Sequence, residues 1–333
     1  MELYLQMGHG MQSMAEELIG LWGGGNVIIS PVNITQDRVV GFSKKITSIG
    51  GNILFDPQMF YPKEGHVKLR AYDYWPQEDV SISTENATEE INRELLRLNK
   101  EIGSSAIILP GLEMKEDALT YGLELMNRSA AYFSSKSDLP LFATLCLYPE
   151  TIRNTSVIEV LVEKLRTIPV TGFYIIPHPS NNEYIVSDPL WMIGMLKLLS
   201  CLKLFGKKTI VGYTSHQGLV YALANVDGIA SGTYMNTRSF VPAKFKSPKD
   251  DDIKHKSTWF YLPTALCEYK AALLDVAMQR GYLDSFKPQG VFSNEYSAML
   301  FSGAQPTSTN YKETNSFKHY LYCLKLQCDL LTK

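Results

Sequence analysis

The sequence predicts a (β/α)₈ barrel followed by a C-terminal helical extension, and three observations support this prediction. Short β-branched runs alternate with stretches of helical periodicity, and this alternation is typical of parallel strands connected by helices. The strands are continuous apolar runs, which is typical of sheets whose outer face is covered by helices. Eight such units fill about 230 residues, the usual size of a (β/α)₈ barrel. An open doubly wound sheet is the alternative, and the count of eight favours the barrel.

The first half of the barrel is marked by glycines and by an insertion. Its strands are expected at residues 2–6, 26–30, 52–56 and 106–109, and its helices at residues 12–22, 35–49, 88–102 and 116–133. Gly23 and Gly50 end the first two helices, because glycine readily adopts the left-handed conformation that closes a helix. An insertion at residues 57–86 follows the third strand. Glu89 and Glu90 then begin a helix, where the helix dipole favours acidic side chains.

The second half repeats the alternation, and the pattern changes after Phe240. Its strands are expected at residues 141–147, 172–176, 208–213 and 227–232, and its helices at residues 156–167, 189–204 and 218–224. A charged loop at residues 244–256 follows, with helices expected at 262–286 and 310–331. We therefore divide the chain into a barrel, residues 1–240, and a C-terminal helical extension, residues 241–333, packed on the barrel.

Composition narrows the classes of function. The formal net charge of −2 argues against a generally basic surface for nucleic acid. No apolar run approaches the roughly 18 residues of a membrane span, and no signal peptide is evident. The five scattered cysteines favour free thiols in a reducing compartment. These features predict a cytoplasmic protein that does not bind membranes.

Candidate site residues follow the strands, because barrel active sites lie at the C-terminal ends of the strands. The candidates for catalysis are Asp56, His178 and His216. The candidates for substrate binding are His9, Ser30, Asn33, Gln58, Trp75, Glu150, Tyr213, Ser215, Ser231, Gly232, Thr233 and Arg238. Glu113 also follows a strand, the fourth.

Asp56 is the leading catalytic candidate. A carboxylate directly after an apolar strand lies in the barrel mouth, where it could act as nucleophile or general base. The alternative is that Asp56 caps the turn made with Pro57. Bond cleavage at a glycosidic carbon usually needs a second carboxyl group. Glu150, Asp188 and Asp73 are the candidates for it.

The loops after the seventh and eighth strands suit an anion. Gly212–Gly218 and Ser231–Thr233 combine glycines with hydroxyls, and Arg238 follows them. Backbone N–H groups at such loops bind phosphate in many barrels. Two ordinary glycine–serine turns are the alternative reading.

No cofactor is predicted. Zinc would need several histidines from different loops, and no close-spaced ligand pair supports it. His319 and Cys323 are four residues apart, and a buried helix face explains them better than a metal clip.

The insertion is rich in aromatic residues. They are Phe60, Tyr61, Tyr72, Tyr74 and Trp75, with Lys63, Lys68 and Arg70 among them. Rings beside cations suit stacking against bases. A lid that packs its own aromatics onto the barrel is the alternative.

Two stretches resemble the tRNA-guanine transglycosylase superfamily, including its branch that inserts deazaguanines into DNA. Residues 53–56 (ILFD) are similar to the family strand that ends in the aspartate used for base exchange, and residues 226–238 to its last strand and following Thr-Arg. The resemblance implies a barrel fold and a nucleobase pocket. Ala230 and Ser231 stand where the family has a second aspartate. Its zinc cysteines are absent except for Cys267.

The sequence therefore leaves three hypotheses. The first is a transferase-like barrel that binds a nucleobase, nucleotide or nucleic acid and acts on an N-glycosidic bond. The second is a lyase or isomerase acting on a small phosphorylated metabolite. The third is a degenerate, non-catalytic barrel that serves as a homo-oligomer or as a partner subunit of a nucleic-acid-modifying complex, with the charged loop at residues 244–256 as its candidate contact.

Overall fold

The computed structural model describes residues 1–76, 85–246 and 257–331, and it divides near residue 250 into two compact units. The N-terminal unit contains all the strands expected for the barrel. The C-terminal unit has its own small core. The insertion is thus described except for residues 77–84, and the charged loop lies outside the described residues from residue 247 onward.

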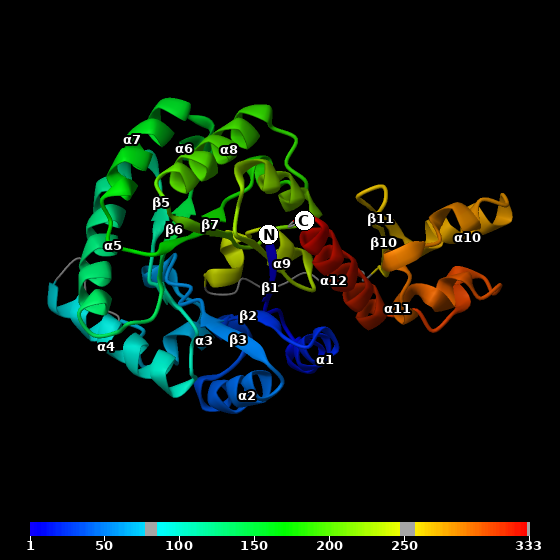
Figure 1. Ribbon diagram of the computed structural model, residues 1–333, viewed down its shortest axis with the longest axis horizontal. Coiled ribbons are helices and arrows are strands. Elements are labelled where there is room, and N and C mark those ends of the chain that lie inside the picture. The colour runs from blue at the N-terminus through cyan, green and yellow to red at the C-terminus, as the bar shows by residue number, and fades with distance from the viewer. Residues whose placement is uncertain (77–84, 247–256, 332–333) are drawn as a thin grey trace. The chain divides into compact units, whose positions relative to one another are not determined.

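Eight parallel strands form the barrel (Figure 1). They are β1 (Glu2–Gln6), β2 (Gly25–Ile29), β3 (Gly51–Phe55), β4 (Ile107–Leu109), β6 (Leu141–Leu147), β7 (Gly172–Pro177), β8 (Lys208–Val211) and β9 (Gly228–Ser231). Their order in the sheet is β3-β2-β1-β9-β8-β7-β6-β4, and the two-residue strand β5 (Glu113–Met114) pairs with β6. The Ser105 N–H donates to the Ile53 oxygen at 2.9 Å, which joins the two ends of this order. The predicted (β/α)₈ fold is confirmed.

Helices surround the strands as expected (Figure 1). They are α1 (Gln12–Trp22), α2 (Gln36–Ser48), α4 (Glu85–Glu101), α5 (Leu119–Ser134), α7 (Thr155–Arg166), α8 (Pro189–Leu204) and the 3₁₀ helix η5 (His216–Ala224). Gly23 ends α1 in the left-handed conformation, with φ of 68°. The Asp188 side chain begins α8 by accepting from the Leu190 and Trp191 N–H groups.

Three short helices lie in the loops that follow the strands. They are α3 (Val67–Arg70), α6 (Pro149–Arg153) and α9 (Met235–Arg238). Because all eight strands are parallel, the loops that carry these helices gather at one end of the barrel. We call this end the mouth.

The C-terminal unit begins with a β-hairpin that the sequence analysis missed. β10 (Trp259–Leu262) pairs antiparallel with β11 (Cys267–Lys270), and α10 (Ala271–Gln279) follows. The single helix expected at residues 262–286 is therefore wrong at its start. The aromatic run of β10 favours a strand, and Leu266 makes the turn with φ of 52°.

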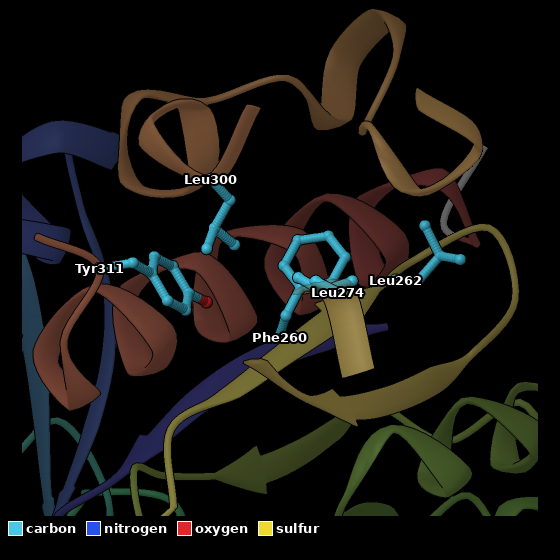
Figure 2. Close-up of a cluster of buried hydrophobic side chains, with 5 residues drawn as sticks. All are labelled: Phe260, Leu262, Leu274, Leu300 and Tyr311. Atoms are coloured by element: carbon cyan, nitrogen blue, oxygen red, sulfur yellow. The ribbon is translucent and has the colours of Figure 1, made fainter. Parts of the chain in front are cut away.

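A small apolar core holds this unit together (Figure 2). It consists of the buried side chains Phe260, Leu262, Leu274, Leu300 and Tyr311. α12 (Glu313–Leu330) is the helix expected at residues 310–331, and α11 (Glu295–Ala298) precedes it. The His319 ring on α12 stacks on Phe260, with centroids 5.1 Å apart. Docking of this unit on the barrel stays a prediction.

Candidate active site

Asp56 lies in the barrel mouth directly after β3, and its side chain is fully buried. Its Oδ2 accepts hydrogen bonds from the hydroxyls of Tyr213 (2.9 Å) and Tyr174 (3.3 Å). Its Oδ1 accepts one from the backbone N–H of Gln58 at 3.0 Å. Burial raises the pKa of Asp56 to about 7, and these hydrogen bonds limit the rise. The carboxyl group is therefore close to half protonated at neutral pH.

The hydrogen bonds around Asp56 continue across the barrel. The Tyr174 hydroxyl also reaches Gln6 Oε1 at 2.8 Å, and Gln6 Nε2 donates to Ser30 Oγ at 3.0 Å. Gln58 Nε2 donates to the Tyr213 oxygen at 2.8 Å. Burial raises the pKa of both tyrosines well above its usual value, so the phenols stay neutral. We call these six residues the floor network (Gln6, Ser30, Asp56, Gln58, Tyr174 and Tyr213).

Two members of the floor network have an unusual backbone. Gln58 has φ of 53° and Tyr213 has φ of 50°, a left-handed conformation that costs non-glycine residues on the order of 1–3 kcal/mol. Their side chains are hydrogen-bonded to each other. Such strain persists only where the surrounding contacts fix it, and it is concentrated at functional sites.

Aromatic rings cover the floor network. Phe60, Phe240 and Phe245 contact one another with ring centroids 5.0–5.3 Å apart. The Tyr213 ring contacts Phe240 and Phe245 at 5.6 and 5.7 Å. All four side chains are buried, so this aromatic cover separates Asp56 from solvent.

A second carboxyl group lies nearer the surface of the mouth. Glu113 Oε1 accepts hydrogen bonds from the Tyr61 hydroxyl at 2.5 Å and from His178 Nδ1 at 3.2 Å. The side chains of Glu113 and His178 are 10% and 11% exposed. Burial acts to raise the pKa of Glu113, but the hydrogen bonds from His178 and Tyr61 and the charge of Lys115 outweigh it and leave that pKa below its usual value. Glu113 is therefore ionised at neutral pH. We call Tyr61, Glu113 and His178 the rim triad.

The His178 ring is held from several sides. Tyr148 and Phe240 meet it edge-on, with centroids 5.5 and 5.8 Å away. The Trp191 indole N–H donates to the His178 backbone oxygen at 2.9 Å. Its Nε2 faces Asn182, an exposed residue, at 3.4 Å. The imidazole is thus fixed by Glu113 on one side and turned toward the surface on the other.

A small pocket opens beside His178, between the loops after β7, β8 and β9. It encloses about 320 Å³ including open solvent. Its lining comprises Pro177, Pro179, Tyr184, Val186, Trp191, Tyr213, Thr214, Ser215, Gln217, Gly218, Tyr221, Arg238, Ser239 and Phe240. The guanidinium of Arg238 is buried there, and its Nε donates to the Gly232 oxygen at 2.9 Å.

The structure brings many of the sequence candidates together. Ser30, Asp56 and Gln58 meet Tyr213 in the floor network, although they come from three different loops. Ser215 and Arg238 line the pocket, and His178 lies between two prolines of its wall. His216 is buried, and its ring lies 6.4 Å from that of Tyr184.

Other candidates have different surroundings. His9 and Glu150 are exposed, and Asn33 Nδ2 donates to the Met7 oxygen at 3.0 Å. The buried hydroxyls of Ser231 and Thr233 have no hydrogen-bond partner among the described residues. Of the carboxyls considered as a second acid, Asp188 caps α8 and pairs with Arg153 at 3.1 Å, and Asp73 pairs with Arg97.

The described aromatics of the insertion form a packed lid. Tyr72 and Tyr74 contact Phe55 with centroids 5.8 Å away, and the Tyr74 hydroxyl donates to the Pro57 oxygen at 2.8 Å. Trp75 is buried against Gly65, where even a Cβ would come within 2.1 Å of its ring. Of these described aromatic residues, Tyr61 alone belongs to the rim triad, through its hydrogen bond to Glu113. These rings are packing groups, and they offer no open stacking surface.

Sequence reasoning missed Gln6 and Tyr174, which lie within strands. The signal for them was present, because each is a polar side chain in an otherwise apolar run. It also left Glu113 without a role and considered Tyr61 only as a stacking ring. Their meeting depends on the path of the insertion, which no local pattern encodes.

In the described ranges, no three His, Cys, Asp or Glu side chains converge as a metal site would require. No helix within those ranges is long and apolar enough to cross a membrane. None of the five cysteines, all in described parts of the chain, forms a disulfide.

Comparison with known proteins identifies no family. No protein-family model and no curated protein sequence matches the chain. Among solved structures, an HpcH/HpaI aldolase/citrate lyase family protein from Burkholderia cenocepacia J2315 is 11% identical (TM-score 0.39, 69% of this chain and 86% of that one). β-Methylaspartase from Clostridium tetanomorphum is 9% identical (0.44, 71% and 54%), and DHDPS from Cyanidioschyzon merolae is 9% identical (0.40, 71% and 71%). At this distance the similarity concerns the barrel fold alone.

Proposed function

We propose that the protein is an acid–base enzyme of the lyase or isomerase kind, acting on a small anionic metabolite in the barrel mouth. The rim triad carries this proposal. A partly exposed histidine, oriented by an ionised glutamate 3.2 Å away, lies beside a pocket with a buried arginine. This arrangement is typical of general acid–base catalysis.

The rim triad defines which atom would move the proton. An ionised carboxylate can only accept, so His178 Nδ1 carries a hydrogen and donates it to Glu113. The proton would then pass between substrate and His178 Nε2. Protonation makes an imidazolium ion, which the adjacent carboxylate of Glu113 stabilises. The hydroxyl of Tyr61 keeps that carboxylate in place.

A small substrate fits the mouth better than a nucleic acid. The pocket beside His178 is small, about 320 Å³ even with open solvent included. The aromatic residues that would stack on bases are instead buried in the lid. These observations favour the metabolite hypothesis over the nucleic-acid one.

Base exchange of the transglycosylase kind is a second candidate, and Asp56 favours it. This carboxyl stands where the resemblance expects the catalytic aspartate, and its pKa of about 7 suits proton transfer at neutral pH. The aromatic cover would have to move before a base could reach it. Loss of nucleobase exchange in Asp56→Asn, with His178→Gln still active, would favour this candidate.

Hydrogen exchange in D₂O tests the principal proposal without knowledge of the product. The purified chain is incubated with a panel of small carboxylic acids and phosphate esters, and loss of substrate C–H signals is followed by NMR. We expect exchange in at least one compound, and about 10²–10⁴-fold slower exchange in His178→Gln, because general acid–base catalysis contributes about that factor.

Matched variants make this result specific. Glu113→Gln should also slow exchange, because glutamine cannot stabilise the imidazolium ion. Glu116→Gln, an exposed glutamate three residues further on, should leave exchange at the wild-type rate. Exchange that survives unchanged in folded His178→Gln would refute the role of the rim triad.

A further inference from the structure

The loop after β7 turns back on itself directly after His178. The Asn182 backbone N–H donates to the Pro179 oxygen at 3.3 Å, which closes a tight turn. Asn181 and Asn182 have φ of 54° and 55°, a left-handed conformation that asparagine tolerates better than most residues. The turn brings the Asn182 side chain back to the imidazole of His178, which lies four residues earlier in the chain.

Both ends of this turn are tied to the start of α8. The Trp191 indole N–H donates to the His178 backbone oxygen at 2.9 Å, and the Ser180 hydroxyl donates to Asp188 Oδ2 at 2.9 Å. Asp188 itself caps α8. The fold therefore fixes the turn, and with it the place of Asn182 beside the ring.

The two ring nitrogens of His178 have different partners. Nδ1 faces ionised Glu113 at 3.2 Å, so Nδ1 carries a hydrogen whether the ring is neutral or charged. Nε2 faces the side-chain amide of Asn182 at 3.4 Å, its one hydrogen-bond partner in the described part of the chain. In the proposed function Nε2 is the atom that gains and loses the proton. Asn182 therefore contacts the reacting nitrogen.

An amide can bond to Nε2 in both protonation states of the ring. Neutral His178 presents a lone pair there, which needs a donor, and the imidazolium ion presents an N–H, which needs an acceptor. Asn182 offers an NH₂ group and a carbonyl oxygen, and rotation of the amide exchanges the two. A carboxylate would offer acceptors alone, and an aliphatic side chain would offer neither.

The same contact is easy to displace. Its length of 3.4 Å exceeds the roughly 2.7–3.2 Å of ordinary hydrogen bonds from nitrogen. Asn182 is exposed, so its amide can turn to solvent without leaving a buried polar group unpaired. His178 keeps its bond to Glu113 when this happens. A substrate that bonds to Nε2 takes the place of the amide.

We infer that Asn182 is a positioning residue, which holds the Nε2 side of His178 in both protonation states and is displaced by the substrate. This inference rests on the proposed function, because it concerns the nitrogen that moves the proton there. Asn182 acts through His178, and the reacting groups remain those of the rim triad.

Diethyl pyrocarbonate tests the contact without any substrate, because it acylates the unprotonated nitrogen of a histidine ring. Modification of His178 in the full chain is followed by peptide mass spectrometry, with exposed His9 as the internal reference. Asn182→Gly keeps the positive φ and removes the amide. We expect His178 to react about 3- to 10-fold faster in this variant, because loss of one ordinary hydrogen bond has about that effect.

Two further variants separate the hydrogen bond from the shape of the turn. Asn181→Gly makes the same change at the neighbouring left-handed residue and should react as wild type does. Asn182→Asp keeps the size of the side chain but offers only acceptors, so it favours the imidazolium ion. His178 should therefore react at higher pH in Asn182→Asp than in wild type. A residue that served only the turn would leave this pH profile unchanged.

The other groups around the ring are the same in all these variants. Ionised Glu113 faces Nδ1, the Tyr148 ring meets the imidazole edge-on with Lys115 Nζ 4.8 Å from its centroid, and Phe240 contacts the imidazole from a further loop. A shifted pH profile therefore reports the change at position 182.

Hydrogen exchange links the contact to the chemistry. In Asn182→Gly, exchange at saturating substrate should slow about 3- to 10-fold, because the ring is held on one side only. The substrate concentration for half-maximal exchange should fall, because no amide has to be displaced. Loss of the turn alone would instead raise that concentration.

The outcomes separate this inference from the proposed function. The inference is overturned if His178 reacts equally fast in wild type and folded Asn182→Gly, if Asn181→Gly speeds the reaction as much, or if exchange in Asn182→Gly matches wild type. Faster modification in Asn182→Gly with no exchange in any compound would reject the acid–base role and leave the contact at Nε2 standing. Should Asn182→Gly fail to fold, the pH profile of Asn182→Asp decides.

Discussion

The floor and the rim of the barrel mouth each hold one carboxyl group, and the two groups behave in opposite ways. Asp56 on the floor is wholly buried, and its pKa rises to about 7. Glu113 on the rim is partly exposed, and its pKa falls below the usual value. Both accept hydrogen bonds from tyrosine, so tyrosine does not explain the difference.

What differs is the rest of each environment. Asp56 accepts hydrogen bonds from two neutral phenols and one backbone N–H, and the aromatic cover excludes water from it. Glu113 has the imidazole of His178 in direct contact and the charge of Lys115 nearby. Hydrogen bonds from neutral donors do not offset complete desolvation, whereas partial exposure, the hydrogen bond from His178 and the charge of Lys115 keep Glu113 ionised. One mouth thus holds one carboxyl group that is close to half protonated at neutral pH and another that is ionised.

Asp56→Asn should give the largest effect on stability, and the effect should depend on pH. The unfolded carboxyl titrates near 3.8 and the folded one near 7. The contribution of Asp56 to the free energy of unfolding is therefore greatest below pH 4 and falls as the pH rises to 7. Asparagine does not titrate, so wild type should lose about 4 kcal/mol relative to the variant between pH 4 and pH 8.

Urea denaturation of both proteins across this range measures that difference. Asp138→Asn, at an exposed aspartate, is the matched control and should follow the wild-type curve. A difference between wild type and Asp56→Asn that stays constant from pH 4 to pH 8 would show that the floor carboxyl is not desolvated.

Tyr61→Phe, in the rim triad, should give the next largest loss of stability. It removes the hydroxyl that donates to Glu113 at 2.5 Å, and a hydrogen bond to a charged group contributes about 2 kcal/mol. The pKa of Glu113 should rise toward its usual value, which titration by NMR would follow. Tyr121→Phe, at an exposed tyrosine, should change neither the free energy of unfolding nor the pKa of Glu113. An unchanged pKa of Glu113 in Tyr61→Phe would mean that His178 and Lys115, and not Tyr61, lower that pKa.

Glu113→Gln should give the smallest effect, and its pH dependence should have the opposite sign. A pKa lowered from 4.5 means that Glu113 stabilises the fold fully above pH 4.5 and that this stabilisation is lost as the pH falls further. The advantage of wild type over the variant should be constant at neutral pH and shrink in acid. If both carboxyl variants drifted in the same direction with pH, the contrast between floor and rim would be wrong.

Most of the fold was predictable because its local signals agree with its tertiary structure. Most residues of the barrel strands are apolar and buried, as in Leu141–Leu147. The bounds of α1 and α8 match their expected ranges, since Gly23 closes one and Pro189 opens the other. The hairpin at residues 259–270 was missed because its turn places Leu266, and no glycine, at positive φ.

The site was only partly predictable. Asp56 and Tyr213 follow strands, and barrel geometry alone brings such residues to one end. Gln6 and Tyr174 could have been predicted with one further rule, that a polar residue within an apolar barrel strand faces other polar groups inside the barrel. The contact of Tyr61 with Glu113 spans 52 residues and depends on how the insertion folds back, so no periodicity or motif announces it.

The floor and the rim are also alike in where their partners come from along the chain. Gln6 meets Tyr174 across 168 residues, Asp56 meets Tyr213 across 157, and Glu113 meets His178 across 65. In each pair one residue precedes β6 and the other lies within or after β7. Neither half-barrel therefore carries a complete floor network or rim triad, and contacts of such long range slow folding. If the two halves were expressed as separate fragments, we expect the proposed hydrogen exchange only after the fragments associate.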